Sequence, residues 1–193
     1  MTTNRIEAFS DGVLAIVITI MVLGMKNPEG YDWDSLKSIT PSFIAYIISF
    51  IYVGIYWNNH HHLFQTIKKV NGKMLWANLS LLFFLSLLPL TTAWMGEHVF
   101  EKIPVMIYGI NLAFCAIAFL ILVKAALSFE GKNSKLAKTL PNRNKEIASV
   151  IVYMCSIILA NFIPIISLIG YTLVAFIWLI PDTRIEKFID SEE

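Results

Sequence analysis

Residues 5–26 read Arg5-Ile-Glu-Ala-Phe9-Ser10-Asp11-Gly12-Val-Leu-Ala15-Ile16-Val-Ile-Thr19-Ile20-Met-Val-Leu23-Gly-Met-Lys26, an apolar segment that carries a carboxylate inside it. At about 1.5 Å per residue, a helix from about residue 4 to residue 25 would be roughly 33 Å long, enough to cross the hydrocarbon core of a bilayer. Asp11 would then lie about two turns inside the helix. Because an ionisable side chain at that depth is costly, we interpret Asp11 as part of a functional or structural polar site.

A second interpretation is that Ser10 or Asp11 caps a helix that begins at Gly12, since Ser, Asp and Gly are favoured around helix starts. That helix would have about 14 residues before Lys26 and a length of about 21 Å. It would be too short to cross a bilayer unless the membrane thinned or a partner shielded it.

The composition of the 193 residues predicts a membrane protein, with 56% apolar residues, 15% charged residues and a mean hydropathy of +0.65. A soluble domain carries more charge. Hydropathy along the chain predicts six spans, at about residues 4–25, 39–63, 75–95, 104–124, 147–163 and 166–181. We therefore expect a single all-α membrane domain over residues 1–193, with six transmembrane helices.

The distribution of Lys and Arg predicts the orientation of these spans. Of the 15 Lys and Arg residues, 12 fall on the side that holds both termini, and the other side receives only Lys26, Lys37 and Lys102. The positive-inside rule then predicts a multi-pass protein of the cell (plasma) membrane with both termini in the cytoplasm. A formal net charge of +1 offers no basic footprint, so we expect no nucleic-acid partner.

Two connectors have a distinctive composition. Residues 125–146 are rich in Lys and contain Gly and Pro, which predicts a cytoplasmic loop able to touch anionic lipid headgroups. Pro164 cannot continue a preceding helix, so it predicts a tight extracellular turn between the last two spans. We expect those two spans to form an antiparallel hairpin.

Three stretches resemble recurring segments of one family. They are Arg5-x-x-x-Phe9-Ser10-Asp11-Gly12 with Ala15-Ile16-x-x-Thr19, then Trp57-Asn58-Asn59-His60-His61-His62-Leu63-Phe64, then Trp76-x-Asn78 with Ser86-x-Leu-Pro89. This pattern resembles the transmembrane protein 175 family of potassium channels, in its short prokaryotic form. The resemblance covers the first half of the chain closely and the second half only by hydropathy. It implies a potassium-permeable homotetramer whose pore is lined by the first helix of each subunit, and it leaves open whether other monovalent cations or protons pass.

We expect the polar positions of these stretches to form a buried structural network, in which His61 and Asn78 hold Ser10 and Asp11. Arg5 and Phe9 belong to the same set of positions. Because Arg5 and Asp11 are six residues apart, they do not share a helical stripe, and each should find partners on neighbouring helices. An unpaired carboxylate at that depth would cost several kcal/mol or take up a proton.

The middle of the first segment carries Ile16, Ile20 and Leu23 on one helical face, with Thr19 beside them. Such a stripe most often packs on lipid or on neighbouring helices, whereas the resemblance implies that it lines the pore. Rings of Ile and Leu would then form an apolar constriction that acts as a gate or seal, and a ring of Thr19 hydroxyls would contribute to selectivity. The alternative for Thr19 is a hydrogen bond back to the carbonyl of Ala15.

Other chemistry is disfavoured. Adjacent helical residues point about 100° apart, so His60, His61 and His62 do not predict a metal site, and we expect neither metal nor cofactor. The sequence shows no Gly-rich phosphate loop and no Ser/His/Asp arrangement, so we expect no enzyme activity. It also lacks the carbonyl filter segment of ordinary potassium channels and an Arg-rich voltage sensor.

Two alternatives to a channel remain. A secondary transporter would place binding groups such as Asn111 and Asn161 near the membrane midplane, with Pro89 as a helix break. The Phe9-Ser10-Asp11 signature has no second copy after residue 96, which weakens an internal repeat. The other alternative is a membrane interaction protein that transports nothing.

Overall fold

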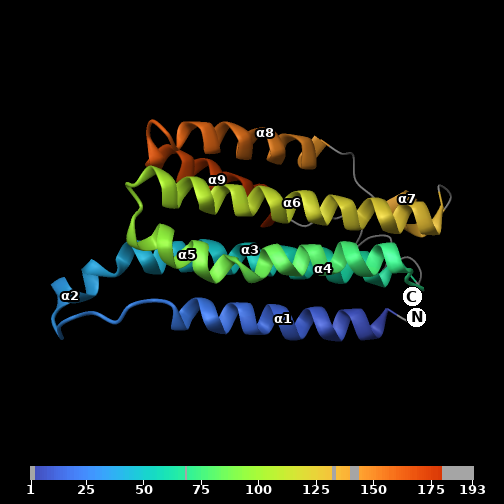
Figure 1. Cartoon of the computed structure of the whole chain (residues 1–193), viewed down its shortest axis with the longest axis horizontal. Coiled ribbons are helices and arrows are strands. Elements are labelled where there is room, and N and C mark those ends of the chain that lie inside the picture. Colours follow the sequence, from blue (N-terminus) through green and yellow to red (C-terminus); the bar gives the residue numbers. More distant parts are fainter. Residues whose placement is uncertain (1–2, 68, 132–133, 140–143, 180–193) are drawn as a thin grey trace.

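The computed structural model describes residues 3–67, 69–131, 134–139 and 144–179. Within these ranges every regular element is a helix, as the sequence predicts (Figure 1). The helices are α1 (Asn4–Leu23), α2 (Trp33–Ser38), α3 (Thr40–Gln65), α4 (Gly72–Ser86), α5 (Leu88–Glu97), α6 (Lys102–Glu130), α7 (Lys135–Thr139), α8 (Asn144–Leu159) and α9 (Pro164–Leu179).

Four segments are long and apolar enough to cross a membrane, namely α1, α3, the α4–α5 pair and α6. The regions predicted as the fifth and sixth spans form α8 and α9, which are shorter apolar helices of 16 residues each. Residues 180 and 181 of the predicted sixth span lie outside the described residues. By length and composition, the described residues therefore contain four spans and one hairpin of two shorter helices.

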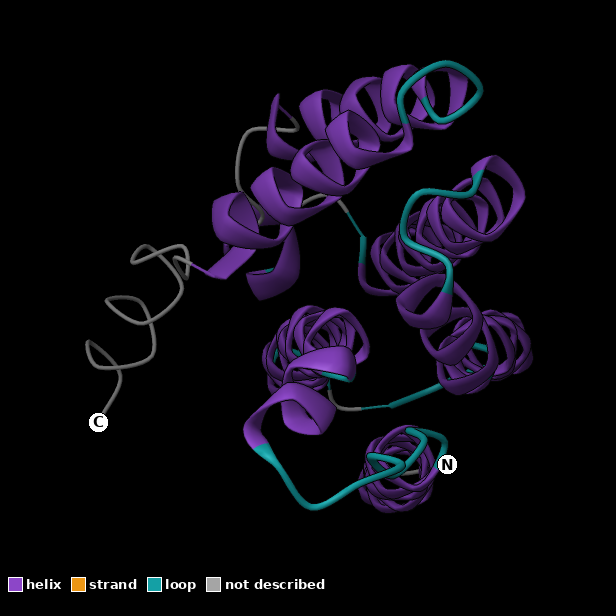
Figure 2. Cartoon of the chain, turned by 90° about the vertical axis from the view of Figure 1, so that its left-hand side faces the viewer, coloured by secondary structure: helices purple, strands orange, loops and turns teal. Residues whose placement is uncertain are grey.

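The first helix begins at Asn4, so the interpretation that Ser10 or Asp11 is an N-cap is wrong. Glu7 lies in the first turn, where a negative charge favours the helix dipole. One face of α1 is buried and packs against α3, α4 and α5. The opposite side has no neighbour within the described part of the chain, and the end-on view shows α1, marked N, at the edge of the bundle (Figure 2).

The predicted third span is not one straight helix. It breaks at Leu87 into α4 and α5, and Pro89 lies in the first turn of α5, where its missing N–H leaves no helical bond unmade. The two pieces pack differently, since α4 lies mainly against α6 and α5 mainly against α3. This segment therefore connects the N-terminal helices to the C-terminal ones.

Two connectors contain more helix than the sequence predicts. In the connector before α3, Asp32 caps the short helix α2 by accepting a hydrogen bond from the Ser35 N–H at 2.8 Å. The predicted loop at residues 125–146 is partly helical, because α6 continues to Glu130 and α7 follows. In this extension of α6, Ala126 is buried while Lys124 and Ser128 are exposed, so the helix continues past the apolar stretch with one side still packed.

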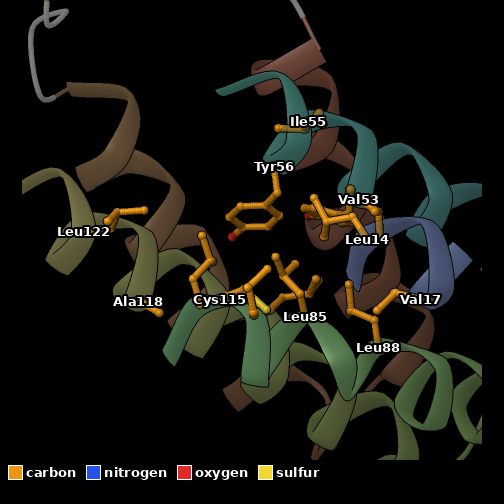
Figure 3. Packing of buried hydrophobic residues seen from close by; sticks show 14 of the residues in the cluster. Leu14, Val17, Val53, Ile55, Tyr56, Leu85, Leu88, Cys115, Ala118 and Leu122 are labelled. Atoms are coloured by element: carbon orange, nitrogen blue, oxygen red, sulfur yellow. The ribbon is translucent and has the colours of Figure 1, made fainter. Parts of the chain in front are cut away.

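The hairpin of α8 and α9 is present, and Pro164 begins α9 as its position in the sequence predicts. This hairpin lies on the far side of α6 from α1 (Figure 1). The apolar core runs between the two groups of helices. At its centre, Tyr56 of α3 lies among Leu14 of α1, Leu85 of α4 and Cys115 of α6 (Figure 3).

Candidate functional site on the first helix

The two faces of α1 have opposite environments. Ile6, Leu14, Val17 and Met21 are buried, and Ser10 shares their face with 0% exposure. The predicted stripe lies on the other face, where Ile16 is 58% exposed, Ile20 49% and Leu23 81%. A single subunit therefore leaves the stripe uncovered over about two turns of helix.

Thr19 is also on the uncovered side of α1. Its hydroxyl donates a hydrogen bond to the Ile16 carbonyl at 2.8 Å, so the backbone partner is Ile16 and not Ala15. Because this bond uses the only proton of the hydroxyl, the lone pairs of Oγ1 stay available as acceptors. The side chain can thus present an oxygen, but not a donor, to whatever lies beside α1.

Three side chains form what we call the N-terminal cluster: Ser10 of α1, His60 of α3 and Asn78 of α4. The Asn78 amide nitrogen donates to Ser10 Oγ at 3.0 Å, and Asn78 Oδ1 lies 2.8 Å from His60 Nε2. All three residues are buried. Since Asn78 Oδ1 can only accept, His60 must carry a proton on Nε2, and the cluster fixes both the tautomer of His60 and the contact between α1 and α4.

Asp11 lies outside this cluster. Its Oδ1 accepts a hydrogen bond from Trp57 Nε1 at 2.9 Å, at an exposed position beside the bundle. Trp57 in turn stacks on His61 with ring centroids 5.9 Å apart and planes 7° from parallel. His61 therefore reaches Asp11 only through Trp57.

The structure corrects three parts of the predicted network. Asp11, expected to be buried with His61 and Asn78, is exposed and accepts its hydrogen bond from Trp57. His60 occupies the position expected for His61, because residues 60 and 61 point about 100° apart on α3 and only the former faces α4. Arg5 and Phe9 are exposed, so the structure does not bring them into the buried cluster. Trp57 belongs to the second stretch that resembles the family, but nothing in the sequence analysis assigns it to Asp11.

A second set of buried hydrogen bonds was missed by sequence reasoning. In what we call the tyrosine cluster, Tyr153 of α8 donates to the Tyr52 hydroxyl at 3.2 Å, and Tyr52 of α3 donates to the Tyr171 carbonyl of α9 at 2.5 Å. Near it, Thr92 donates to Ser49 at 2.7 Å, and Ser49 lies 3.0 Å from the Tyr108 hydroxyl. Hydropathy gives little signal for such groups, because Tyr, Ser and Thr occur throughout apolar helices.

The residues considered for a transporter are used in other ways. Asn111 is buried and donates to Thr91 at 3.3 Å, which joins α6 to α5. Asn161 lies in the turn before α9, exposed, with its amide 3.7 Å from the Met106 sulfur. Among the described residues, no group of three or more His, Cys, Asp or Glu side chains is placed to hold a metal ion.

Comparison with known proteins gives these positions a context. The model of the family described as endosomal/lysosomal potassium channel TMEM175 matches residues 5–89. A potassium channel of Chryseobacterium sp. (strain P1-3) is 59% identical over 187 residues, which are 97% of each chain. This chain belongs to the TMEM175 family. The expectation drawn from the Phe9-Ser10-Asp11 pattern is thereby confirmed.

Other TMEM175 relatives agree. A potassium channel of Streptomyces collinus is 35% identical over 61% of each chain. The crystal structure of a TMEM175 homologue from Chamaesiphon minutus, described as a lysosomal potassium-selective channel homologue, superposes with a TM-score of 0.77 at 27% identity and covers 91% of this chain and 95% of its own. The TMEM175 family is one of ion channels, so the expectation that the chain is no enzyme is confirmed.

The residues matched by the TMEM175 model include α1, α3, α4 and the start of α5. The match therefore contains the whole N-terminal cluster and the contact of Asp11 with Trp57. It does not reach α6, α8 or α9, for which the similarity rests on the Chryseobacterium chain and the Chamaesiphon structure.

Proposed function

We propose that this chain is one subunit of a potassium-permeable cation channel, in which α1 of each of four subunits lines a central pore. Its support is the family and the near full-length identity to a relative named as a potassium channel. The observation that carries the pore assignment is the uncovered face of α1. That face bears the Ile16, Ile20 and Leu23 stripe together with the oxygen of Thr19.

Lipid alone is a poor neighbour for the first half of α1, because Asp11 is exposed beside Trp57 and an ionised carboxylate facing hydrocarbon is costly. Asp11 is nine residues before Ile20 and does not share the face of the stripe, so this cost argues for water or protein near Asp11 and not for the stripe itself. One chain contains one such helix, and one helix cannot enclose a path, so a pore needs several subunits around an axis. We adopt four from the family resemblance.

In this arrangement the three apolar rings form the narrowest part of the pore. An apolar ring a few Å wide expels water, and a cation cannot cross it without its hydration shell, so the rings act as a gate or seal. Thr19 oxygens, with their protons committed to the backbone, replace part of that shell between the rings of Ile16 and Ile20. The N-terminal cluster fixes the rotation of α1 that points these residues at the axis.

We further propose six membrane crossings with both termini in the cytoplasm of the cell. At about 1.5 Å per residue, α8 and α9 are each about 24 Å long, a mismatch that local thinning of the bilayer can accommodate. The basic side chains in the described part of the chain support a cytoplasmic location of the termini. Four of them lie at the end of the bundle where α1 begins, namely Arg5, Lys69, Lys73 and Lys124. The lysines at the other end are Lys26, Lys37 and Lys102.

Single-channel recording of the purified protein in a planar bilayer tests the proposal. Unitary currents are expected, whereas slow saturable flux would indicate a transporter and silence a protein that transports nothing. We expect Ile16→Asn to raise the basal current and weaken discrimination among monovalent cations, with milder effects for Ile20→Asn and Leu23→Asn. The matched control is Val22→Asn, since Val22 is exposed on α1 but turned away from the stripe. If the three stripe variants assembled as well as wild type and conducted identically to it, the stripe would face a neighbouring helix or lipid and the pore would lie elsewhere.

Selectivity is tested at Thr19. Thr19→Ala should lower potassium over sodium permeability, and Thr19→Ser, which keeps the oxygen, should not. An unchanged reversal potential for Thr19→Ala in mixed ions would exclude this role.

A further inference from the structure

A groove between the start of α4 and the end of α6 has no role in the proposed pore. It is open, has a volume of about 950 Å³, and is formed where these antiparallel helices pack at the end of the bundle that holds the start of α1. From α4 it is lined by Gly72, Lys73 and Trp76, and from α6 by Ile121, Ala125 and Phe129, among others. Among the described residues, no carboxylate lines the groove.

The groove has a polar end and an apolar floor. Lys73 is exposed and has no ion pair among the described residues. Trp76, one turn further into α4, is 74% exposed, and Ile121 and Phe129 are exposed beside it. Phe129 lies near the end of α6, toward Lys73, whereas Ile121 lies two turns deeper. A cation, an exposed Trp and then an aliphatic side chain is the order met when passing from a membrane surface into its hydrocarbon.

The backbone adds positive character at the polar end. Asn71 caps α4 by accepting from the Met74 N–H at 3.0 Å, which leaves the N–H groups of Gly72 and Lys73 without a carbonyl partner inside the helix. A side chain at Gly72 would meet nothing within 4 Å, so a ligand can approach the backbone there. The positive end of the helix dipole, the free N–H groups and the Lys73 ammonium all favour an anion.

We propose that this groove binds an anionic phospholipid, with its phosphate at Lys73 and the start of α4 and an acyl chain along Trp76, Ile121 and Phe129. The charge complementarity and the apolar floor together select a lipid over a free anion, because a free phosphate would use only the polar end. The proposal requires that the bundle be embedded in a membrane, and it does not require conduction.

Trp76 provides the probe. The whole protein is reconstituted into nanodiscs that contain either brominated phosphatidylglycerol or brominated phosphatidylcholine at equal mole fraction, and Trp fluorescence is recorded. The contribution of Trp76 is the difference between wild type and Trp76→Phe. We expect the anionic brominated lipid to quench that contribution at least twofold more strongly than the zwitterionic one, and inorganic phosphate to leave the quenching unchanged.

The same measurement on Lys73→Glu and Lys73→Gln should abolish the preference for the anionic lipid. The matched control is Lys102→Glu, since Lys102 is an exposed lysine at the start of α6 but lies at the opposite end of the bundle. Circular dichroism and particle mass identify any variant that fails to fold or assemble. If Lys73→Glu fails in this way, Lys73→Gln alone provides the test.

Three results would overturn the proposal. Equal quenching by both lipids would mean that the groove has no headgroup preference, and loss of the preference on adding phosphate would mean that it binds a free anion. No quenching of Trp76 by either lipid, with a smaller particle mass for Lys73→Glu, would mean that a second copy of the chain covers the groove. Because the readout is optical, none of these results depends on whether the protein conducts.

Discussion

The N-terminal cluster and the tyrosine cluster hold different pairs of helices by different chemistry. The first joins α1 to α3 and α4 through a hydroxyl, an imidazole and an amide, none of which packs well when its hydrogen bonds are lost. The second joins α3 to α8 and α9 through phenol hydroxyls whose rings still fill space when the oxygen is removed. Directional bonds therefore add to the packing that holds α1, whereas the outer hairpin is held mainly by packing.

The largest effect should follow from breaking the N-terminal cluster at Asn78. Asn78→Leu removes both hydrogen bonds and leaves Ser10 and His60 buried without partners, at about 1–3 kcal/mol for each group. We expect a loss of about 2–4 kcal/mol in unfolding free energy. A lower thermal midpoint in detergent and fewer assembled particles would show it.

The control for Asn78→Leu is the triple variant with Ser10→Ala and His60→Phe. Replacing all partners by apolar groups removes the unsatisfied atoms, so stability should return most of the way. If the single variant were as stable as wild type, the N-terminal cluster would not be what holds α1.

A smaller effect should follow from overfilling the contact between α6 and α9 next to the tyrosine cluster. A methyl group at Gly109 would overlap the hydroxyl and ring of Tyr171, which is buried. Gly109→Ala should therefore destabilise the protein by about 1–3 kcal/mol. The thermal midpoint measures this, and Gly109→Ala with Tyr171→Leu should recover part of the loss.

Gly170→Ala is the matched comparison on α9, because its methyl would meet chiefly the Ser156 hydroxyl. A hydroxyl can rotate away or be removed by Ser156→Ala, which a tyrosine ring cannot. Equal losses for Gly109→Ala and Gly170→Ala would contradict the idea that ring packing dominates this half of the chain.

Tyr52→Phe should lower the free energy of unfolding less than Asn78→Leu or Gly109→Ala. It removes two hydrogen bonds of the tyrosine cluster but keeps the ring, and hydrogen bonds between membrane helices contribute on average about 0.6 kcal/mol each. We expect a loss of about 1 kcal/mol and unchanged assembly. A loss as large as that of Asn78→Leu would remove the distinction between the two clusters.

The smallest effect lies outside both clusters, at the cap of α2. The hydrogen bonds from Ser35 lower the pKa of Asp32, so the cap contributes stability at pH values above the ordinary pKa of Asp, and this is lost as the pH falls through the lowered value. Asp32→Ala should speed hydrogen exchange at the Ser35 amide at neutral pH. Wild type should approach the variant only in strong acid, while the thermal midpoint stays unchanged in both.

Much of this fold could be predicted from the sequence. Apolar segments long enough to cross a bilayer predict the helices, and the Phe9-Ser10-Asp11 pattern indicates the family. The contact of Ser10 with Asn78 follows from two polar residues in apolar helices that must find partners. The choice of His60 over His61 could not be predicted, since it depends on the rotation of α3 about its axis. Three consecutive histidines give no indication of that rotation.

The tyrosine cluster could not be predicted for a different reason. Tyr52 lies about a hundred residues or more before Tyr153 and Tyr171, and tyrosine is common at both buried and interfacial positions. Their meeting point is set by how α9 packs on α3 and how α8 packs on α6 and α9. That packing is a property of the assembled bundle and leaves no pattern along the chain.

Because the segment of α4 and α5 breaks at Leu87, the number of residues at the break sets how α5 is rotated relative to α4. This rotation affects the contacts of the segment with both the N-terminal and the C-terminal helices. Since α4 packs on α6 while α5 buries Thr91, Thr92 and Met95, inserting a single residue at the break would turn α5 by about 100° relative to α4. Thr92 would leave Ser49, and Thr91 would leave Asn111. The number of residues between Asn78 and Thr92 therefore fixes the rotation of α5 relative to α4. It keeps the contact of α4 with α1 compatible with the contacts of α5 with α3 and α6.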